Sequence, residues 1–179
     1  MTVPTLKIGS KAPSFNLPGV DGKNHSLEDY HGMKALVVIF SCNHCPYVVA
    51  YEDRMVELQR DYGPKRVQLI AINSNETKNF PEDDFPNMVK RAKDKGFNFP
   101  YLRDENQSIA GAYRPTKTPE VFLFNQNLVL MYHGAIDDNY EDPKKVKKKY
   151  LRDALDNVLA GQLIKTANTT PVGCSVKWL

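Results

Sequence analysis

The residues of this sequence best suited to chemistry are Cys42 and Cys45, which are separated only by Asn43 and His44. The whole chain of 179 residues holds three cysteines. A chain of this length buries roughly 70% of the surface that its unfolded form exposes, so it needs no disulfide or metal to hold a core. Each cysteine is therefore either a small buried apolar residue or a chemical reagent.

The segments on either side of the cysteines predict a strand followed by a helix. Residues 35–40 form a continuous apolar run, which is typical of a strand buried on both faces. From Pro46 onward apolar residues recur at helical spacing until Gly63, which predicts an amphipathic helix. We expect Cys42 to cap this helix. Free N–H groups and the helix dipole stabilise an anion there, so they would lower the pKa of its thiol.

The spacing of the two cysteines predicts dithiol–disulfide exchange. Cys45 follows Cys42 by three residues, so it lies one turn below and within disulfide reach. We predict that Cys42 is the attacking nucleophile and that Cys45 resolves the mixed disulfide. A protonated His44 would stabilise the thiolate and make the disulfide a stronger oxidant.

Two other interpretations of the cysteine pair remain open. Two buried cysteines occur at this spacing by chance in some chains. A half zinc site is the second alternative, and it would draw on Cys42, Cys45, His44 and Cys174. Structural zinc prefers two paired ligand motifs, and the sequence holds one.

The rest of the chain predicts an α/β fold. A second buried strand at 67–73 completes a parallel βαβ unit with the first. The run of lysines at 144–149 is interpreted as the solvated face of the final helix. We predict one domain over 1–179, with a hairpin extension at 1–32 and a tail at 162–179. The other predicted elements are helices near 85–96, 108–113 and 146–159 and a hairpin of 121–124 with 128–133.

Thr118 and Pro119, directly before the strand at 121–124, extend the argument beyond the cysteines. Together with the cysteine turn they resemble the thioredoxin superfamily, which places a cis-proline beside its cysteine pair. The resemblance implies a cis Pro119 and a Thr118 whose backbone receives a substrate strand. The alternative is an ordinary loop proline that enters a strand.

The two ends of the chain narrow the resemblance. The opening at 8–15 and the terminal sequence Gly-Cys-Ser-Val-Lys-Trp at 173–178 are similar to redoxins of the alkyl hydroperoxide reductase and thiol-specific antioxidant type. The whole chain resembles a mostly bacterial peroxiredoxin-like subgroup that carries a thioredoxin-style cysteine pair. This implies a central mixed sheet flanked by helices.

One departure from true peroxiredoxins bears on activity. True peroxiredoxins carry a Thr or Ser three residues before their reactive cysteine and a Pro seven residues before it. When Cys45 is aligned with that cysteine, these two positions hold Cys42 and Val38. Pro119 stands near the place where peroxiredoxins have an Arg. The groups that orient peroxide are missing, so slow thiol peroxidase activity, an antioxidant role, is an alternative to exchange. Glu120 is either a proton acceptor for Cys45 or a salt-bridged surface carboxylate.

Cys174 has two interpretations. It is either a third redox cysteine that approaches the pair or a packed thiol in a tail pinned by Val176 and Trp178.

Net charge and hydrophobicity limit the classes of partner that we expect for this protein. The net charge of +3 is too small to indicate nucleic acid binding. The N-terminus has no signal-peptide pattern, and the apolar run at 35–40 is far shorter than a membrane span, so we expect a cytoplasmic protein with no membrane association. The predicted partners are protein or small-molecule disulfides and a thiol electron donor such as a thioredoxin or glutathione system. We expect no cofactor and no metal.

Overall fold

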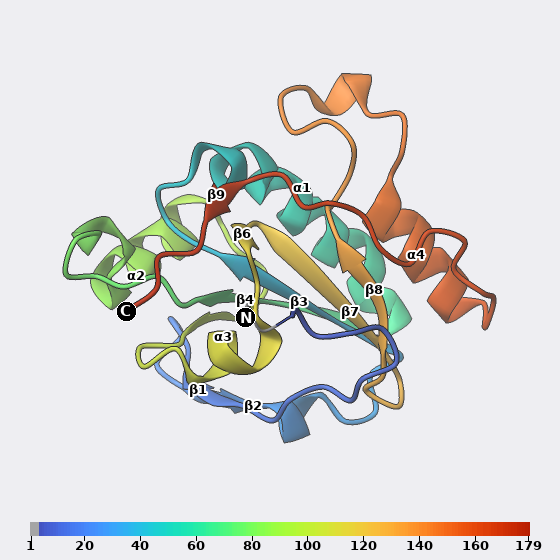
Figure 1. Cartoon of the computed structure of the whole chain (residues 1–179), viewed down its shortest axis with the longest axis horizontal. Coiled ribbons are helices and arrows are strands. Elements are labelled where there is room, and N and C mark those ends of the chain that lie inside the picture. The colour runs from blue at the N-terminus through green and yellow to red at the C-terminus, as the bar shows by residue number, and fades with distance from the viewer. Residues whose placement is uncertain (1–3) are drawn as a thin grey trace.

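A computed structural model describes residues 4–179 and shows a five-stranded mixed sheet at the centre of the fold (Figure 1). The strand order is β5-β4-β3-β7-β8. Strands β5, β4 and β3 run parallel to one another. Strand β7 pairs antiparallel with β3, and β8 pairs antiparallel with β7. The strands are β3 (Ala35–Ser41), β4 (Val67–Asn73), β5 (Tyr101–Arg103), β7 (Glu120–Asn125) and β8 (Leu130–Gly134).

Layers cover both faces of this sheet (Figure 1). One face packs against α1 (Pro46–Tyr62), α2 (Phe85–Asp94) and α4 (Tyr150–Leu159). The other face packs against α3 (Ser108–Tyr113) and a hairpin of β1 (Asn16–Pro18) and β2 (Asn24–Ser26). Short 3-10 turns cover Leu27–Tyr30, Gly63–Lys65, Pro81–Asp83 and Pro143–Lys145.

Strand β3 shows why its sequence is apolar without alternation. Val37 and Ile39 point into the core under α1 and α4, whereas Val38 and Phe40 point into the core under α3 and the hairpin. A strand buried on both faces needs apolar side chains at every position. The predicted α/β fold with a mixed sheet, flanking helices and an N-terminal hairpin is confirmed.

The start of the final helix differs from the prediction. We expected the helix from residue 146 with the lysine run on its first turns, but α4 begins at Tyr150. The Asp138 carboxylate accepts the N–H of Lys147 at 2.9 Å, and the Asp138 N–H donates to the carbonyl of Lys148 at 3.2 Å. These bonds hold Lys147 and Lys148 outside the helix, after the 3-10 turn at Pro143–Lys145, so α4 starts after the lysine run.

The C-terminal tail is also more ordered than its sequence indicated. A two-residue strand, β9 (Cys174–Ser175), pairs antiparallel with β6 (Lys117–Thr118) just before Pro119. In Figure 1 the red end of the chain accordingly runs past β6 at the edge of the fold. Across residues 4–179, no helix is long and apolar enough to cross a membrane.

Candidate active site

The cysteine turn lies where β3 ends and α1 begins. Cys42 directly follows β3, and α1 starts at Pro46 with Cys45 as its N-cap residue. The prediction that Cys42 caps the helix is therefore wrong. Proline is favoured as the first helical residue because its missing N–H would have no partner there, so the cap falls one residue earlier, at Cys45.

Both sulfurs lie against the segment that precedes Pro119. The Thr118–Pro119 peptide bond is cis. In its protonated form Cys45 donates a hydrogen bond to the Thr118 carbonyl at 3.4 Å, and Cys42 Sγ lies 3.5 Å from Thr118 Oγ1. Cys42 is 3% exposed and Cys45 is fully buried, and both are free thiols. The fold thus brings the cysteine turn and Thr118 together from distant parts of the sequence.

Hydrogen bonds place the negative charge of the reduced pair on Cys45. The bond from the Cys42 thiol is the main cause that lowers the pKa of Cys45 to about 4. Burial opposes this shift, and bonds from Cys174 and from the backbone of Val48 add to it. The pKa of Cys42 is raised by the same bond, by burial and by the charge of Asp83. The pKa that the sequence predicted to be low at Cys42 is therefore low at Cys45.

Sequence analysis did not identify Asp83, a buried carboxylate beside the turn. Its oxygens accept the Asn43 N–H at 2.7 Å and the Asn75 side-chain amide at 2.9 Å. His44 Nδ1 lies 2.7 Å from the same carboxylate, and the His44 ring stacks on Phe80. The available signal was position: Asp83 lies in the polar segment after β4, whose carboxyl end meets that of β3.

Glu120 is buried rather than on the surface. One of its oxygens accepts the N–H groups of Thr116 and Lys117 at 2.7 and 2.9 Å, and the other lies 2.6 Å from His133 Nε2. Within the described chain, no hydrogen bond joins Glu120 to either sulfur. The geometry makes Glu120 an anchor of the segment that carries Thr118.

Cys174 reaches the pair through the tail strand. Its side chain packs against the buried cluster of Cys42, Cys45 and Val48. Burial, followed by the nearby Cys45 sulfur, raises the pKa of Cys174 to about 11. All three cysteines of the chain therefore lie in one site.

Comparison with known proteins decides the family. A family profile described as AhpC/TSA matches residues 8–133, more than half of the chain. The protein belongs to the AhpC/TSA family. The thiol-disulfide oxidoreductase ResA of Geobacillus thermodenitrificans is 30% identical over 124 residues, a match that spans 68% of this chain and 66% of that protein. The match thus covers slightly less than two thirds of the relative.

Solved structures similar to this AhpC/TSA family member identify its fold. A hypothetical protein from Sinorhizobium meliloti is 35% identical, with a TM-score of 0.92 over 98% of this chain and 97% of the other. A thiol:disulfide interchange protein DsbE from Chlorobium tepidum is 22% identical, with a TM-score of 0.70 over 87% and 99% of the two chains. The fold is thioredoxin-like.

A metal-compatible group of side chains also includes Cys42. One ligand atom each from Cys42, His44 and Asp83 lies within 4.8 Å of the others. The zinc alternative from the sequence had combined the three cysteines with His44, so the structure supplies a carboxylate that was not considered. The Asp83 oxygens already accept hydrogen bonds from Asn43, Asn73 and Asn75, so binding a cation would compete with these bonds.

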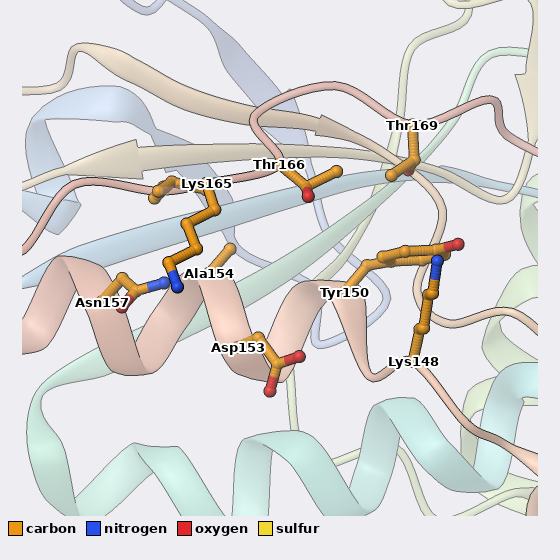
Figure 2. Close-up of a pocket in the computed structure, with 9 residues that line it drawn as sticks. Lys148, Tyr150, Asp153, Ala154, Asn157, Lys165, Thr166 and Thr169 are labelled. Carbon is orange, nitrogen blue, oxygen red and sulfur yellow. The ribbon is translucent and has the colours of Figure 1, made fainter.

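Figure 2 shows a hollow in this AhpC/TSA family member that lies away from the cysteines. Its volume is about 360 Å³, and its lining comes from α4 and the segment that follows it. Lys148 and Tyr150 lie at one end, Asn157 and Lys165 at the other (Figure 2). No cysteine lines this hollow.

Proposed function

We propose that this protein is a thiol–disulfide oxidoreductase that exchanges disulfides through Cys42 and Cys45. The observation that carries the proposal is the packed pair of buried sulfurs, both set against Thr118 at the N-terminus of α1. The family membership and the distant similarity to ResA support the same class of chemistry.

The small difference in exposure supports Cys42 as the attacking cysteine. Cys42 is 3% exposed and Cys45 is fully buried, so a substrate disulfide would meet Cys42 first. The Cys42 proton passes to the neighbouring Cys45 thiolate, and the Cys42 thiolate then attacks one substrate sulfur. The substrate S–S bond breaks, and its second sulfur leaves with the electron pair and takes a proton from solvent.

Cys45 completes the reaction. It gives its proton to solvent, and its thiolate attacks Cys42 Sγ, so the bond between Cys42 and the substrate breaks and the first substrate sulfur leaves as a thiolate. The substrate disulfide gains two electrons, and the pair ends as the Cys42–Cys45 disulfide. His44 and Asp83 set the local charge during these steps. We propose that protein or small-molecule disulfides are the substrates, that a thioredoxin or glutathione system in the cytoplasm restores the thiols, and that no cofactor takes part.

A trapping experiment tests the order. Both variants carry Cys174→Ser so that only the pair reacts, and each is exposed to oxidised glutathione and analysed by mass spectrometry. Cys45→Ser should accumulate a glutathione adduct at Cys42, because nothing resolves it. Cys42→Ser should react much more slowly. Trapping by Cys42→Ser alone would reverse the assignment, and peroxide consumption faster than that of free cysteine would favour a peroxidase.

A further inference from the structure

The tail strand β9 occupies the backbone edge that an incoming substrate strand would use. Its register sets Cys174 directly opposite Thr118, the residue before Pro119. An extended substrate that pairs with Thr118 would place one of its own residues at this position. The chain therefore already holds a cysteine where a substrate would present one.

The docking of the tail is specific. A Cβ atom at Gly173 would lie 2.1 Å from the carbonyl oxygen of Thr118, so a side chain at residue 173 is incompatible with the close approach of the two backbones. Val176 is buried, and its N–H donates to the carbonyl of Thr116 at 3.4 Å. The N–H of Lys177 donates a hydrogen bond to Asn75 Oδ1 at 2.9 Å. The carbonyl of Lys177 accepts the N–H of Glu76 at 2.9 Å and the side-chain amide of Gln107 at 2.8 Å.

We propose that Cys174 is a third redox cysteine that exchanges internally with Cys45 in place of a substrate thiol. The proposal rests on the proposed function of the pair. Its basis is geometric: Cys174 packs against the two buried cysteines, and its strand sets it opposite Thr118, whose carbonyl lies 3.4 Å from Cys45 Sγ. No other described thiol competes for this position.

The exchange needs no external oxidant or reductant. In the oxidised protein the Cys174 thiol loses its proton to solvent, and its thiolate attacks Cys45 Sγ. The Cys45–Cys174 bond forms, the Cys42–Cys45 bond breaks, and Cys42 leaves with the electron pair. One disulfide is present before and after. Once Cys45 is in a disulfide, its charge no longer raises the pKa of Cys174, which favours this attack.

The internal exchange has a functional consequence. It moves the disulfide from Cys42 and Cys45 to Cys45 and the half-buried Cys174, and it frees the thiol of Cys42. The enzyme would then hold its oxidising equivalents in the Cys45–Cys174 disulfide while its attacking cysteine stays reduced.

Disulfide mapping in a Cys42→Ser variant tests the proposal. Folding is first compared with the wild-type chain by thermal melting, and Cys42→Ala serves as a second variant if serine disturbs the site. After oxidation with glutathione disulfide and digestion without reductant, most chains should contain an internal Cys45–Cys174 disulfide.

The matched control moves the thiol by one residue. Cys42→Ser is combined with Cys174→Ser and Ser175→Cys, so the same number of thiols is kept but the tail thiol points to the opposite side of β9. This variant should give glutathione adducts and no internal disulfide. Equal internal pairing in the control, or only adducts and dimers in Cys42→Ser, would overturn the proposal.

A third variant separates the two proposals. Cys174→Ser retains Cys42 and Cys45, and its ability to form their disulfide and to reduce glutathione disulfide reports on the pair alone. If it does so while Cys42→Ser forms no internal disulfide, only the role of Cys174 fails. If it does neither, the proposed function fails as well.

Discussion

The buried carboxylate of Asp83 lies 2.7 Å from Nδ1 of His44, and both residues lie next to the Cys42 thiol. The charge of Asp83 is one of the causes that raise the pKa of Cys42. Asp83 belongs to the segment after β4, and His44 to the turn between the cysteines. Two polar groups from neighbouring strand ends thus act on the attacking sulfur.

Removing the charge of Asp83 should make Cys42 more reactive. In Asp83→Asn the thiolate of Cys42 no longer faces a buried negative charge, whereas a side chain of the same shape remains. We expect alkylation of Cys42 at neutral pH to accelerate by roughly twofold to tenfold, which corresponds to about 0.4 to 1.4 kcal/mol. Iodoacetamide kinetics with mass spectrometry measure the rate at each cysteine.

Asp84→Asn is the matched control for this charge change. Asp84 is the N-cap of α2, and its side chain accepts the Asn87 N–H at 2.9 Å. Asparagine caps helices about as well as aspartate, so the helix is retained while the same charge is lost one residue away. The control should leave the rate unchanged. An unchanged rate in Asp83→Asn would show that His44 already balances the carboxylate.

The pH dependence of the thiolate should identify Cys45 as the charged sulfur. Its pKa is lowered from about 9 to about 4, so the thiolate of the reduced protein should persist at neutral pH and disappear as the pH falls through about 4. The stability that this shift gives the reduced protein is complete above pH 9 and is lost as the pH falls toward 4. Ultraviolet absorbance of the thiolate, with the oxidised protein as the blank, follows the titration.

Two variants locate the charge. Cys42→Ser keeps a hydroxyl that can donate to Cys45, so the thiolate absorbance should still titrate in the acidic range. Cys42→Ala lacks this donor, so the titration should move to higher pH. Cys45→Ser should abolish the titration. A titration that survives in Cys45→Ser would place the thiolate on Cys42 instead.

The sequence predicted the sheet and the cysteine turn because both depend on local patterns. The apolar run of β3 and the helical spacing after Pro46 each specify one element. The strand β5 escaped notice because three residues, Tyr101–Arg103, are too few to show a period. The helix cap was misplaced by one turn because proline at the first helical position determines where α1 begins.

The surroundings of the cysteines depended on contacts that no local pattern reveals. Asp83 looked like one acidic residue in a polar loop until the fold set it against Asn43 and Asn75. The two interpretations of Cys174 stayed open because a two-residue strand leaves no periodicity that would place it. The position of Thr118 beside the pair was implied only through the resemblance to the thioredoxin superfamily.

The buried contact between the Glu120 carboxylate and His133 should matter for stability. Glu120→Gln leaves buried donors of Thr116 and Lys117 with a weaker acceptor and removes the charge that His133 faces. We expect the free energy of unfolding to fall by about 1 to 3 kcal/mol. Urea denaturation of the reduced protein measures it.

Glu28→Gln provides the comparison for Glu120. Glu28 pairs with His31 on the surface, and both side chains are more than half exposed. Its loss should change the free energy of unfolding by less than about 0.5 kcal/mol. A Glu120→Gln variant with unchanged stability and slower disulfide exchange would support a proton acceptor for Cys45 instead of an anchor.

Undocking the tail should expose the attacking cysteine. In Gly173→Ala the added methyl group would overlap the carbonyl of Thr118, so β9 must move away from β6. We expect faster alkylation of Cys42 and a smaller yield of the Cys45–Cys174 disulfide in the Cys42→Ser background. Gly111→Ala in α3 is the control, because its added methyl group meets no atom within 4 Å and should alter neither result. If Gly173→Ala leaves both measurements at their original values, the tail neither covers Cys42 nor presents Cys174 in the way that the pairing of β9 with β6 indicates.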